Sequence, residues 1–349
     1  MATVSVVIPA LDAKDTIALT INSLQSQTRL PDEIIIVVGP NDNTSLGLET
    51  VPTTVRFLKV NVPSVFTRDA QWKRREGARA SVGSVIFFAD SKALIEKHSI
   101  ENALRLMDVA AVSVVAGISP DWPDQQQHLI SKVHDHALIM NCPSFPHQAV
   151  LNKANFGHTE SLPVTTALAM KREVFAAIEA DFAVEFSSIA STYDDYLLSW
   201  LVVSAGYDIL LTDQVIGYHK HRLNWKEYRR QISRSGQSAA IMLQQYPGCP
   251  FGQRRKIQVI LIWAVLLMGM IMSIFSALHF GLAQTLLLGI LGYSVLGFMN
   301  LRKAKWDPAG FVIPLFTIVL ILTFSWHFSN IVLKPRETQQ FDKRYFQAH

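Results

Sequence analysis

The sequence predicts an α/β domain of alternating strands and helices, followed by a helical region that enters a membrane. In the first 90 residues, strand-length apolar runs alternate with segments whose apolar residues recur at helical spacing. After residue 256 there are three apolar stretches of about 20 residues without Lys, Arg, Asp or Glu. Each is long enough to cross the roughly 30 Å hydrocarbon core of a bilayer as a helix.

The first elements follow one another in the order of a βαβ unit. A buried strand is expected at residues 3–9, a helix at 16–27, and a second strand at 34–39 that ends in turn residues. This order within a short segment predicts a right-handed crossover between parallel strands. A third strand at 55–60 and a helix at 68–80 continue the alternation.

The domain is organised around the stretch at residues 84–98. Residues 85–88 are typical of a central strand, and Asp90 follows them in a polar break before a segment expected to be helical. Because ligands of open α/β sheets bind beyond the carboxyl ends of strands, Asp90 predicts a ligand site. The alternative is that Asp90 only caps the helix after it.

Pattern alone favours a nucleotide-binding α/β half-domain and excludes two common classes. No GxGxxG or GxxxxGK[ST] segment is present, which argues against a dinucleotide oxidoreductase and a P-loop NTPase. The formal net charge is only +4, and no nucleic-acid partner is expected. The N-terminus lacks the basic region of a signal peptide, so the first domain is expected in the cytoplasm.

Five segments, in order, resemble the family 2 glycosyltransferases of the GT-A fold. They are VSVVIPALDAKDTI, DEIIIVV, RREGARASVGSVIFFADS, YDDYLLSWLVVSAGYDI and RRQISRSG, and they lie within residues 3–236. The resemblance implies a Rossmann-like, nucleotide-sugar-binding domain. It also implies a nucleotide-diphosphate sugar donor and a hexosyltransferase-like reaction.

The resemblance assigns donor-binding roles to residues near the first two strands. Pro9 and Ala10 match the strand-end turn that meets the nucleotide base in this family. The family's acidic residue after the second strand is replaced by Gly39-Pro40, and Asp42 stands three positions late. Asp42 is therefore the candidate for the base contact.

A second group of matches concerns the donor diphosphate. Arg75 and Gly77 match the family's Arg-Asn-x-Gly-like helix beneath the diphosphate. Asp90 matches the first Asp of the family's DxD motif, but Lys92 stands at the second. His219 ends a strand-like run at the place where such enzymes often have a late metal ligand.

Lys92 leaves two alternatives open. Mg²⁺ and Mn²⁺ take oxygen ligands, which Lys does not have. Lys92 either pairs directly with the diphosphate in place of the ion, or a divalent metal is retained by Asp90, His219 and the phosphates.

The acidic pair Asp194-Asp195 opens a predicted helix and matches the family's catalytic pair. Asp195 falls on the residue that acts as general base, which takes a proton from the acceptor hydroxyl as it attacks. The alternative is that both carboxylates only stabilise the helix, because they lie at the positive, N-terminal end of its dipole.

A basic amphipathic helix precedes the apolar stretches. Gln231 and Arg234 match the family's QxxRW motif, with Ser235 in place of Trp, and are expected to contact the donor. The missing Trp favours addition of a single sugar over processive synthesis. The neighbouring Arg229 and Arg230 suggest contact with a membrane surface, the diphosphate or a lipid phosphate.

The expected organisation has five parts. They are a nucleotide-binding half at 1–115, an acceptor-binding half at 116–222, interfacial helices at 223–255, about three transmembrane helices at 256–333, and a tail at 334–349.

Basic residues suggest the orientation of these helices. Arg254-Arg255-Lys256 and Arg302-Lys303-Lys305 flank the first two apolar stretches at ends expected to be cytoplasmic. A third crossing would place the basic tail outside, against the positive-inside rule. The third stretch, which contains Pro314, either crosses or is re-entrant.

Together these features predict a multi-pass membrane glycosyltransferase with a cytoplasmic catalytic domain, of the kind used in polysaccharide biosynthesis. Its partners would be a nucleotide-sugar donor, a lipid-linked or glycan acceptor, and membrane lipids. The alternatives are a polyprenyl-phosphate glycosyltransferase and a degenerate scaffold that binds nucleotide sugar without turnover.

Overall fold

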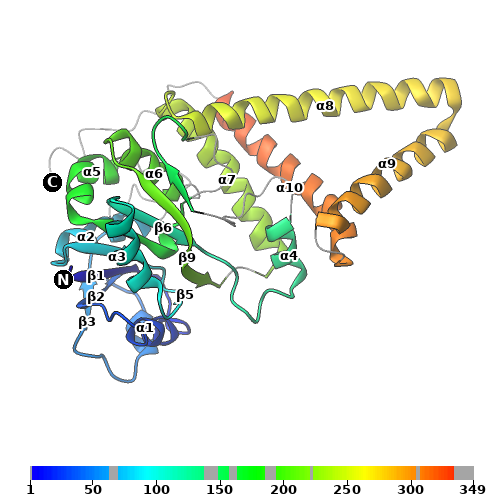
Figure 1. Ribbon diagram of the computed structural model, residues 1–349. Coiled ribbons are helices and arrows are strands. Elements are labelled where there is room, and N and C mark those ends of the chain that lie inside the picture. The colour runs from blue at the N-terminus through cyan, green and yellow to red at the C-terminus, as the bar shows by residue number, and fades with distance from the viewer. Residues whose placement is uncertain are drawn as a thin grey trace. The chain divides into compact units, whose positions relative to one another are not determined.

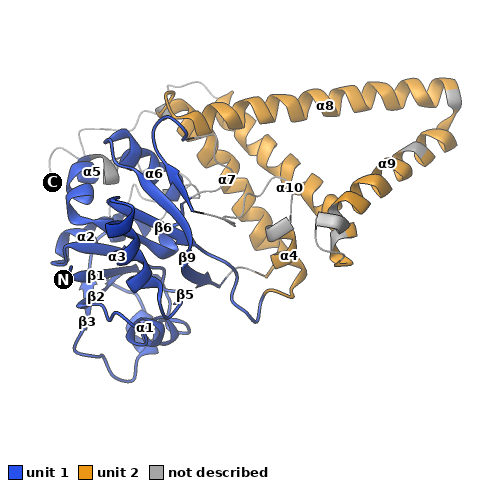
Figure 2. Cartoon of the chain, viewed as in Figure 1, with its two compact units in different colours: residues 1–125, 143–221, 339–349 blue, residues 126–142, 222–338 orange. Residues whose placement is uncertain are grey.

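The computed structural model describes residues 2–62, 70–136, 148–156, 163–184, 194–220, 223–303 and 307–333. These residues form two compact units, drawn in different colours in Figure 2. The first unit lies between residues 2 and 125 and between 148 and 220, and the second takes residues 126–136 and those from 223 to 333.

The first unit begins with a parallel sheet and its helices, as Figure 1 shows in blue and cyan. In chain order the elements are β1 (Val4–Pro9), α1 (Ile17–Gln25), β2 (Glu33–Val38), the 3₁₀ turn η1 (Thr44–Gly47), β3 (Val55–Lys59), α2 (Ala70–Ala80) and β4 (Val85–Phe88). β1 lies between β2 and β4, β3 pairs with β2, and all these pairings are parallel. The predicted order of strands and helices is confirmed; residues 68–69, where the second helix was expected to begin, lie outside the described residues.

The sheet then continues through strands of mixed direction. The further elements are β5 (Ala93–Ile95), α3 (Ser99–Val109), β6 (Val114–Ile118), β7 (Ala149–Leu151), the 3₁₀ turn η2 (Thr165–Ala167), β8 (Leu168–Lys171), α5 (Arg172–Val184), α6 (Asp194–Ser204) and β9 (Ile209–His219). The strand order is β3-β2-β1-β4-β8-β6-β9-β5, and β7 pairs with β9. β8 is antiparallel to both of its neighbours, so the sheet changes direction next to β4.

One local prediction was wrong. The chain after Asp90 does not become helical at once, because Ala93–Ile95 forms β5 and pairs with β9. The next helix, α3, begins only at Ser99. Pairing of this segment with β9, which is distant in the sequence, therefore outweighs the helical pattern of the local sequence.

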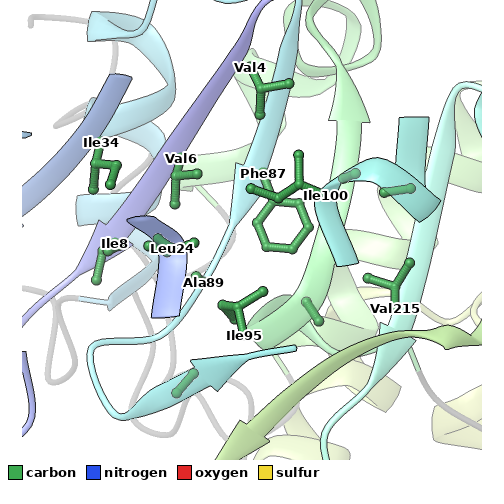
Figure 3. Packing of buried hydrophobic residues seen from close by; sticks show 14 of the residues in the cluster. Val4, Val6, Ile8, Leu24, Ile34, Phe87, Ala89, Ile95, Ile100 and Val215 are labelled. Carbon is green, nitrogen blue, oxygen red and sulfur yellow. The ribbon is translucent and has the colours of Figure 1, made fainter. Parts of the chain in front are cut away.

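The core of this unit is a layer of apolar side chains between the sheet and its helices (Figure 3). Alternate residues of β1 supply Val4, Val6 and Ile8, and Leu24 of α1 packs in the same cluster. All six residues of β1 are buried, as expected of a strand covered on both faces. Its β-branched side chains suit such a position.

Gly77 allows α2 to pack closely against the sheet. A Cβ at this position would lie 2.4 Å from Val7 Cγ1 and 2.8 Å from Val37 Cγ2. Any larger residue would push α2 away from the sheet. The glycine therefore sets how near the basic side chains of α2 come to the strand ends.

The second unit is helical in the part that the structure describes. It contains α4 (Leu129–His136), α7 (Trp225–Gln245), α8 (Pro250–Phe280), α9 (Leu282–Lys303) and α10 (Ala309–Val332). The segments Pro250–His279, Leu282–Met299 and Phe311–Val332 are long and apolar enough to cross a membrane, by length and composition. Most large apolar side chains of α8 and α9 are exposed, which is the expected state of lipid-facing helices.

α10 packs along α7 with the same chain direction. Near their starts, the rings of Trp225 and Phe316 lie 4.7 Å apart. Further along, a Cβ at Gly236 would lie 2.4 Å from the backbone oxygen of Phe324. Near their ends, the amide of Gln244 donates to the backbone oxygen of Ile331 at 3.3 Å. The two helices therefore run side by side over most of α7.

The two ends of α10 contact different helices of the same unit. Near its start, the Tyr293 hydroxyl of α9 donates to the backbone oxygen of Phe311 at 3.0 Å. Near its end, the Trp263 indole of α8 donates to the Ser329 hydroxyl at 3.1 Å. α10 thus contacts both α9 and α8 near the middle of each helix.

Candidate active site

Asp90 lies just beyond the end of β4, where three segments of the first unit meet. The antiparallel register pairs Phe88 with Leu168, so two residues further on Thr166 lies opposite Asp90. The Thr166 hydroxyl donates to Asp90 Oδ2 at 2.9 Å, and Arg74 of α2 donates to Oδ1 at 2.7 Å. The next helix begins only at Ser99, so Asp90 does not cap a helix, and that alternative is wrong.

The environment of Asp90 keeps it ionised. Burial by itself would raise the pKa of this carboxyl group, because desolvation disfavours the charged form. The charges of Arg74 and His219, together with the hydrogen bonds from Thr166 and Arg74, outweigh burial and hold the pKa of Asp90 below its ordinary value. Asp90 is consequently a carboxylate at neutral pH.

The structure brings His219 and Lys92 to the same strand ends. β5 and β9 pair with Ala93 opposite His219, and the Lys220 amide donates to the Lys92 carbonyl at 3.0 Å. His219 Nε2 lies 3.6 Å from Asp90 Oδ2. The Lys92 side chain is exposed and makes no ion pair with any residue that the structure describes.

Asp90 and His219 would suit a divalent ion only together with ligands from outside the protein. Two donors that share one ion at about 2.1 Å each lie about 3 to 4 Å apart, and the 3.6 Å between Nε2 and Oδ2 is in that range. No group of three or more His, Cys, Asp or Glu side chains suited to a metal occurs among the described residues. Phosphate oxygens and water would have to complete the coordination, as is common for Mg²⁺.

Asp195 is linked to Asp90 through two adjacent threonines. The Thr165 hydroxyl donates to Asp195 Oδ1 at 2.6 Å, while Thr166 binds Asp90. Both threonines belong to η2, which therefore holds both carboxylates. The sequence did not predict a role for these two hydroxyl groups.

Arg74, not Arg75, is the arginine that binds Asp90. Arg75 forms an ion pair with Glu76 at 2.9 Å and lies 3.9 Å from Glu179 of α5. The quoted motif has four positions, so a glycine at Gly77 places its arginine at residue 74. Counting the positions of the motif would have identified Arg74 from the sequence. That Arg74 contacts Asp90 could be seen only in the folded structure. A diphosphate contact by Arg75 stays a prediction.

Pro9, Ala10 and Asp42 lie where β1 and β2 end. Ala10 is buried, and its backbone oxygen accepts a hydrogen bond from Lys73 Nζ. Asp42 accepts from the backbone amides of Asp12 at 3.0 Å and Thr44 at 2.8 Å. Asp42 therefore has a structural role in this loop, and its contact with a nucleotide base stays a prediction.

The remaining predicted site residues belong to other segments. Gln231 and Arg234 lie on α7, in the second unit. Asp194 begins α6, but its side chain is outside the described part of the structure. Their proposed roles are therefore predictions from the sequence.

Asp90→Asn should destabilise the protein at neutral pH, because it leaves the buried Arg74 without its charged partner. We expect the free energy of unfolding to fall by about 1.5 to 3 kcal/mol, the range for a hydrogen bond to a charged group. The folded-state pKa lies below the ordinary 3.8, so the carboxylate stabilises the fold above that pH. This contribution is lost as the pH falls through the folded pKa.

Thermal unfolding of the two proteins from pH 7 to pH 3 tests this prediction. The difference in Tm should be largest near neutral pH and shrink below about pH 4. Asp213→Asn, at an exposed position of β9, is the matched control and should change Tm little. A constant difference across the whole pH range would contradict the ion-pair explanation.

Residues 5–178 match the family model described as Glycosyl transferase family 2. No curated protein matches the chain by sequence. The matched residues include β1, α2, β4 and η2, and therefore Asp90 with its partners Arg74 and Thr166.

Three solved structures are similar to this chain, and only the first has a TM-score above 0.5. The mannosyltransferase PcManGT from Pyrobaculum calidifontis, in complex with GDP-Man and Mn²⁺, has a TM-score of 0.60 and 14% identity, covering 95% of this chain and 87% of that chain. TarS from S. aureus has a TM-score of 0.45 and 14% identity, covering 68% and 39%. A mycobacterial protein has a TM-score of 0.43 and 20% identity, covering 71% and 75%.

The likeness to PcManGT shows a shared fold, and this chain has a mixed α/β sheet of GT-A type followed by three long apolar helices. Through residues 5–178, the chain belongs to glycosyl transferase family 2 and is a glycosyltransferase.

Proposed function

We propose that this protein transfers one sugar from a nucleotide-diphosphate donor to a lipid-linked or glycan acceptor at the cytoplasmic face of a membrane. The observation that carries the proposal is the linked pair of carboxylates. Asp90 at the end of β4 and Asp195 at the start of α6 are held by the neighbouring hydroxyls of Thr166 and Thr165.

Asp195 would act as the general base. The acceptor hydroxyl attacks the anomeric carbon of the sugar, its proton passes to the Asp195 carboxylate, and the bond from that carbon to the diphosphate oxygen breaks. The hydroxyl attacks on the face opposite the diphosphate, so the configuration at the anomeric carbon inverts, and the nucleoside diphosphate leaves with the bonding electrons. The hydrogen bond from Thr165 orients the Asp195 carboxylate for this step.

Positive groups near Asp90 would bind the leaving diphosphate. Lys92 and Lys220 are both exposed. Lys92 directly precedes β5, Lys220 directly follows β9, and a backbone hydrogen bond joins the two residues. Asp90 and His219 would hold a divalent metal together with the phosphates. Such an ion would neutralise the charge that develops on the leaving group. PcManGT is described with Mn²⁺ and GDP-Man, which makes this metal and nucleotide the first to test here.

Release of nucleoside diphosphate by the purified protein, with and without EDTA, tests the proposed activity. Turnover that EDTA abolishes supports the metal-dependent reaction, and turnover that survives EDTA supports direct pairing by Lys92. Donor binding, measured by thermal shift against several nucleotide sugars, without any release of nucleotide would favour the degenerate scaffold.

We also propose that α8 and α9 cross the membrane as a hairpin and that α10 lies at its cytoplasmic surface. The start of α10 packs against α9 at Tyr293 and Gly297, in the half of α9 that leads to Arg302 and Lys303. Further along, the guanidinium of Arg255 in α8 lies 5.9 Å from the centre of the Phe324 ring of α10. A helix that crossed from the end of α9 would instead finish beside the far end of α8. These contacts favour two crossings.

The charges of α7 support the same arrangement. α7 carries Lys226, Glu227, Arg229, Arg230 and Arg234. An arginine or lysine at the centre of a bilayer costs about 2.5 to 3.5 kcal/mol on insertion scales. α10 runs beside α7 from Phe316 to Ile331, about 22 Å of its length, so a crossing α10 would draw these charges into the hydrocarbon.

Asp195→Asn should lower turnover by about 100-fold or more, because the amide cannot accept the acceptor's proton. Donor affinity should stay within twofold, since the substituted side chain keeps its volume. Steady-state kinetics and a donor thermal shift measure the two effects. Asp208→Asn, an exposed acid before β9, is the control; equal activity of both variants would remove Asp195 from the mechanism.

Lys92→Ala should weaken donor binding by about 1.5 to 3 kcal/mol, the range for a charged hydrogen bond. If Lys92 replaces the metal, added Mn²⁺ will not restore affinity. If Asp90 and His219 retain the metal, Lys92→Asp will tighten Mn²⁺ binding, which calorimetry measures. Unchanged donor affinity in Lys92→Ala would show that this side chain points away from the phosphates.

A cysteine at Leu333, just after α10, should be protected from a membrane-impermeant maleimide added outside the cell, whereas one at Leu278 near the end of α8 should react. Both positions are exposed in the structure. Burial raises the pKa of Cys249 to about 11, so its thiol stays unreactive near pH 7. For this experiment, the other cysteine of the chain, Cys142, would be replaced by Ser. External labelling at Leu333 would refute the surface position of α10.

A further inference from the structure

A cavity of about 470 Å³ lies between α7 and α10, entirely within the second unit. From α7 it is lined by Lys226, Arg229, Arg230 and Ser233, and from α10 by residues that include Thr323 and Trp326. The α7 positions are spaced by three, one and three residues, so they lie on one face of the helix. The cavity therefore combines a basic wall with a wall that carries an aromatic ring.

No acidic side chain lines this cavity among the described residues, and Glu227 of α7 is not part of its wall. Lys226, Arg229 and Arg230 are exposed and form no ion pair with the described residues. Like charges one helical turn apart repel each other. An anion in the cavity would remove this repulsion and accept several charge-assisted hydrogen bonds.

The shape of the donors favours a phosphate group. Arginine presents a planar fork of N–H groups that matches the oxygens of a phosphate, and Lys226 adds a third positive charge. The hydroxyls of Ser233 and Thr323 can donate to the remaining oxygens. A phosphate monoester or diester is therefore the ligand class that this wall fits.

The other wall favours a lipid as the molecule that bears the phosphate. Trp326 is 58% exposed although it lies on an apolar helix, and Leu322 lies beside it in the cavity. Tryptophan is enriched at the level of membrane headgroups. Outside the cavity, α10 exposes Phe311, Leu315 and Ile318, which give an acyl or prenyl chain an apolar path.

We propose that the cavity between α7 and α10 binds the phosphate headgroup of a membrane lipid. The proposal rests on the surface position of α10 proposed above, but not on the transfer chemistry. Two sources share this chemistry: a polyprenyl phosphate, which would be an acceptor, and an anionic phospholipid. The phosphate is held by the basic face of α7, and the chain leaves along α10.

Native mass spectrometry of the delipidated full-length protein tests the proposal. The probes are undecaprenyl phosphate, phosphatidic acid, phosphatidylcholine and inorganic phosphate, each titrated separately. We expect at least one of the first two to bind. Phosphatidylcholine should not bind, because its choline cation would lie against the basic wall. Arg229→Gln combined with Arg230→Gln should weaken that binding by about tenfold or more, which corresponds to about 1.4 kcal/mol.

The matched control removes two positive charges elsewhere in the same unit. Arg254→Gln with Lys256→Gln, on α8, should change lipid affinity by less than about twofold. Equal losses in both double variants would reduce the effect to general surface charge and overturn the proposal. Arg229→Lys with Arg230→Lys, which keeps both charges, should retain binding of the lipid.

Two further results distinguish the possible ligands. Trp326→Ala should weaken the binding of the lipid phosphates. It should leave the binding of inorganic phosphate unchanged, because only the lipids have a chain. Inorganic phosphate that binds as tightly as either lipid would overturn the lipid assignment. Preference for undecaprenyl phosphate identifies the acceptor as the source, and preference for phosphatidic acid identifies a structural lipid. None of these measurements requires turnover, so their failure is separate from failure of the proposed activity.

Discussion

The contact between Asp90 and Arg74 is the interaction on which the arrangement of the first unit depends. Arg74 is 5% exposed and Asp90 23% exposed at the side chain, so the pair lies largely away from water. A buried ion pair adds little net stability, because desolvation offsets the attraction, but either charge alone would be costly. The pair therefore requires α2 to stay beside the end of β4. Thr166, in the turn before β8, also binds Asp90 and so holds that turn at the same place.

Two glycines make these close approaches sterically allowed. At Gly77 a Cβ would collide with β1 and β2, and at Gly217 it would lie 2.9 Å from the backbone oxygen of Thr166. Gly217 lets β9 approach the turn that holds both carboxylates, and β9 then places His219 near Asp90. Chain reversal at β8 completes the arrangement, because only an antiparallel neighbour of β4 brings Thr166 level with Asp90.

The second unit is governed by the pairing of an apolar helix with a charged one. Helix α10 is apolar enough to enter a membrane, yet α7 packs along one side of it, and Ile313, Thr317 and Leu320 of α10 are buried. The free energy of transferring arginine into hydrocarbon is unfavourable, so the pair is best accommodated where lipid meets water. Hydropathy alone evaluates each helix separately and does not include this constraint.

The sequence by itself determined the α/β class, the order of the first strands and helices, the presence and approximate positions of three apolar helices, and Asp90 as a strand-end residue. These features follow from local periodicity and from turn residues, which act over a few positions of the chain. Only the tertiary structure decided that Arg74 rather than Arg75 binds Asp90, that Ala93–Ile95 is a strand, and that Thr165 and Thr166 hold two carboxylates. Each of these depends on contacts between residues distant in the sequence, such as the 76 positions between Thr166 and Asp90. Local patterns contain no information about which distant strand becomes a neighbour, because that choice is made by packing and register across the whole sheet.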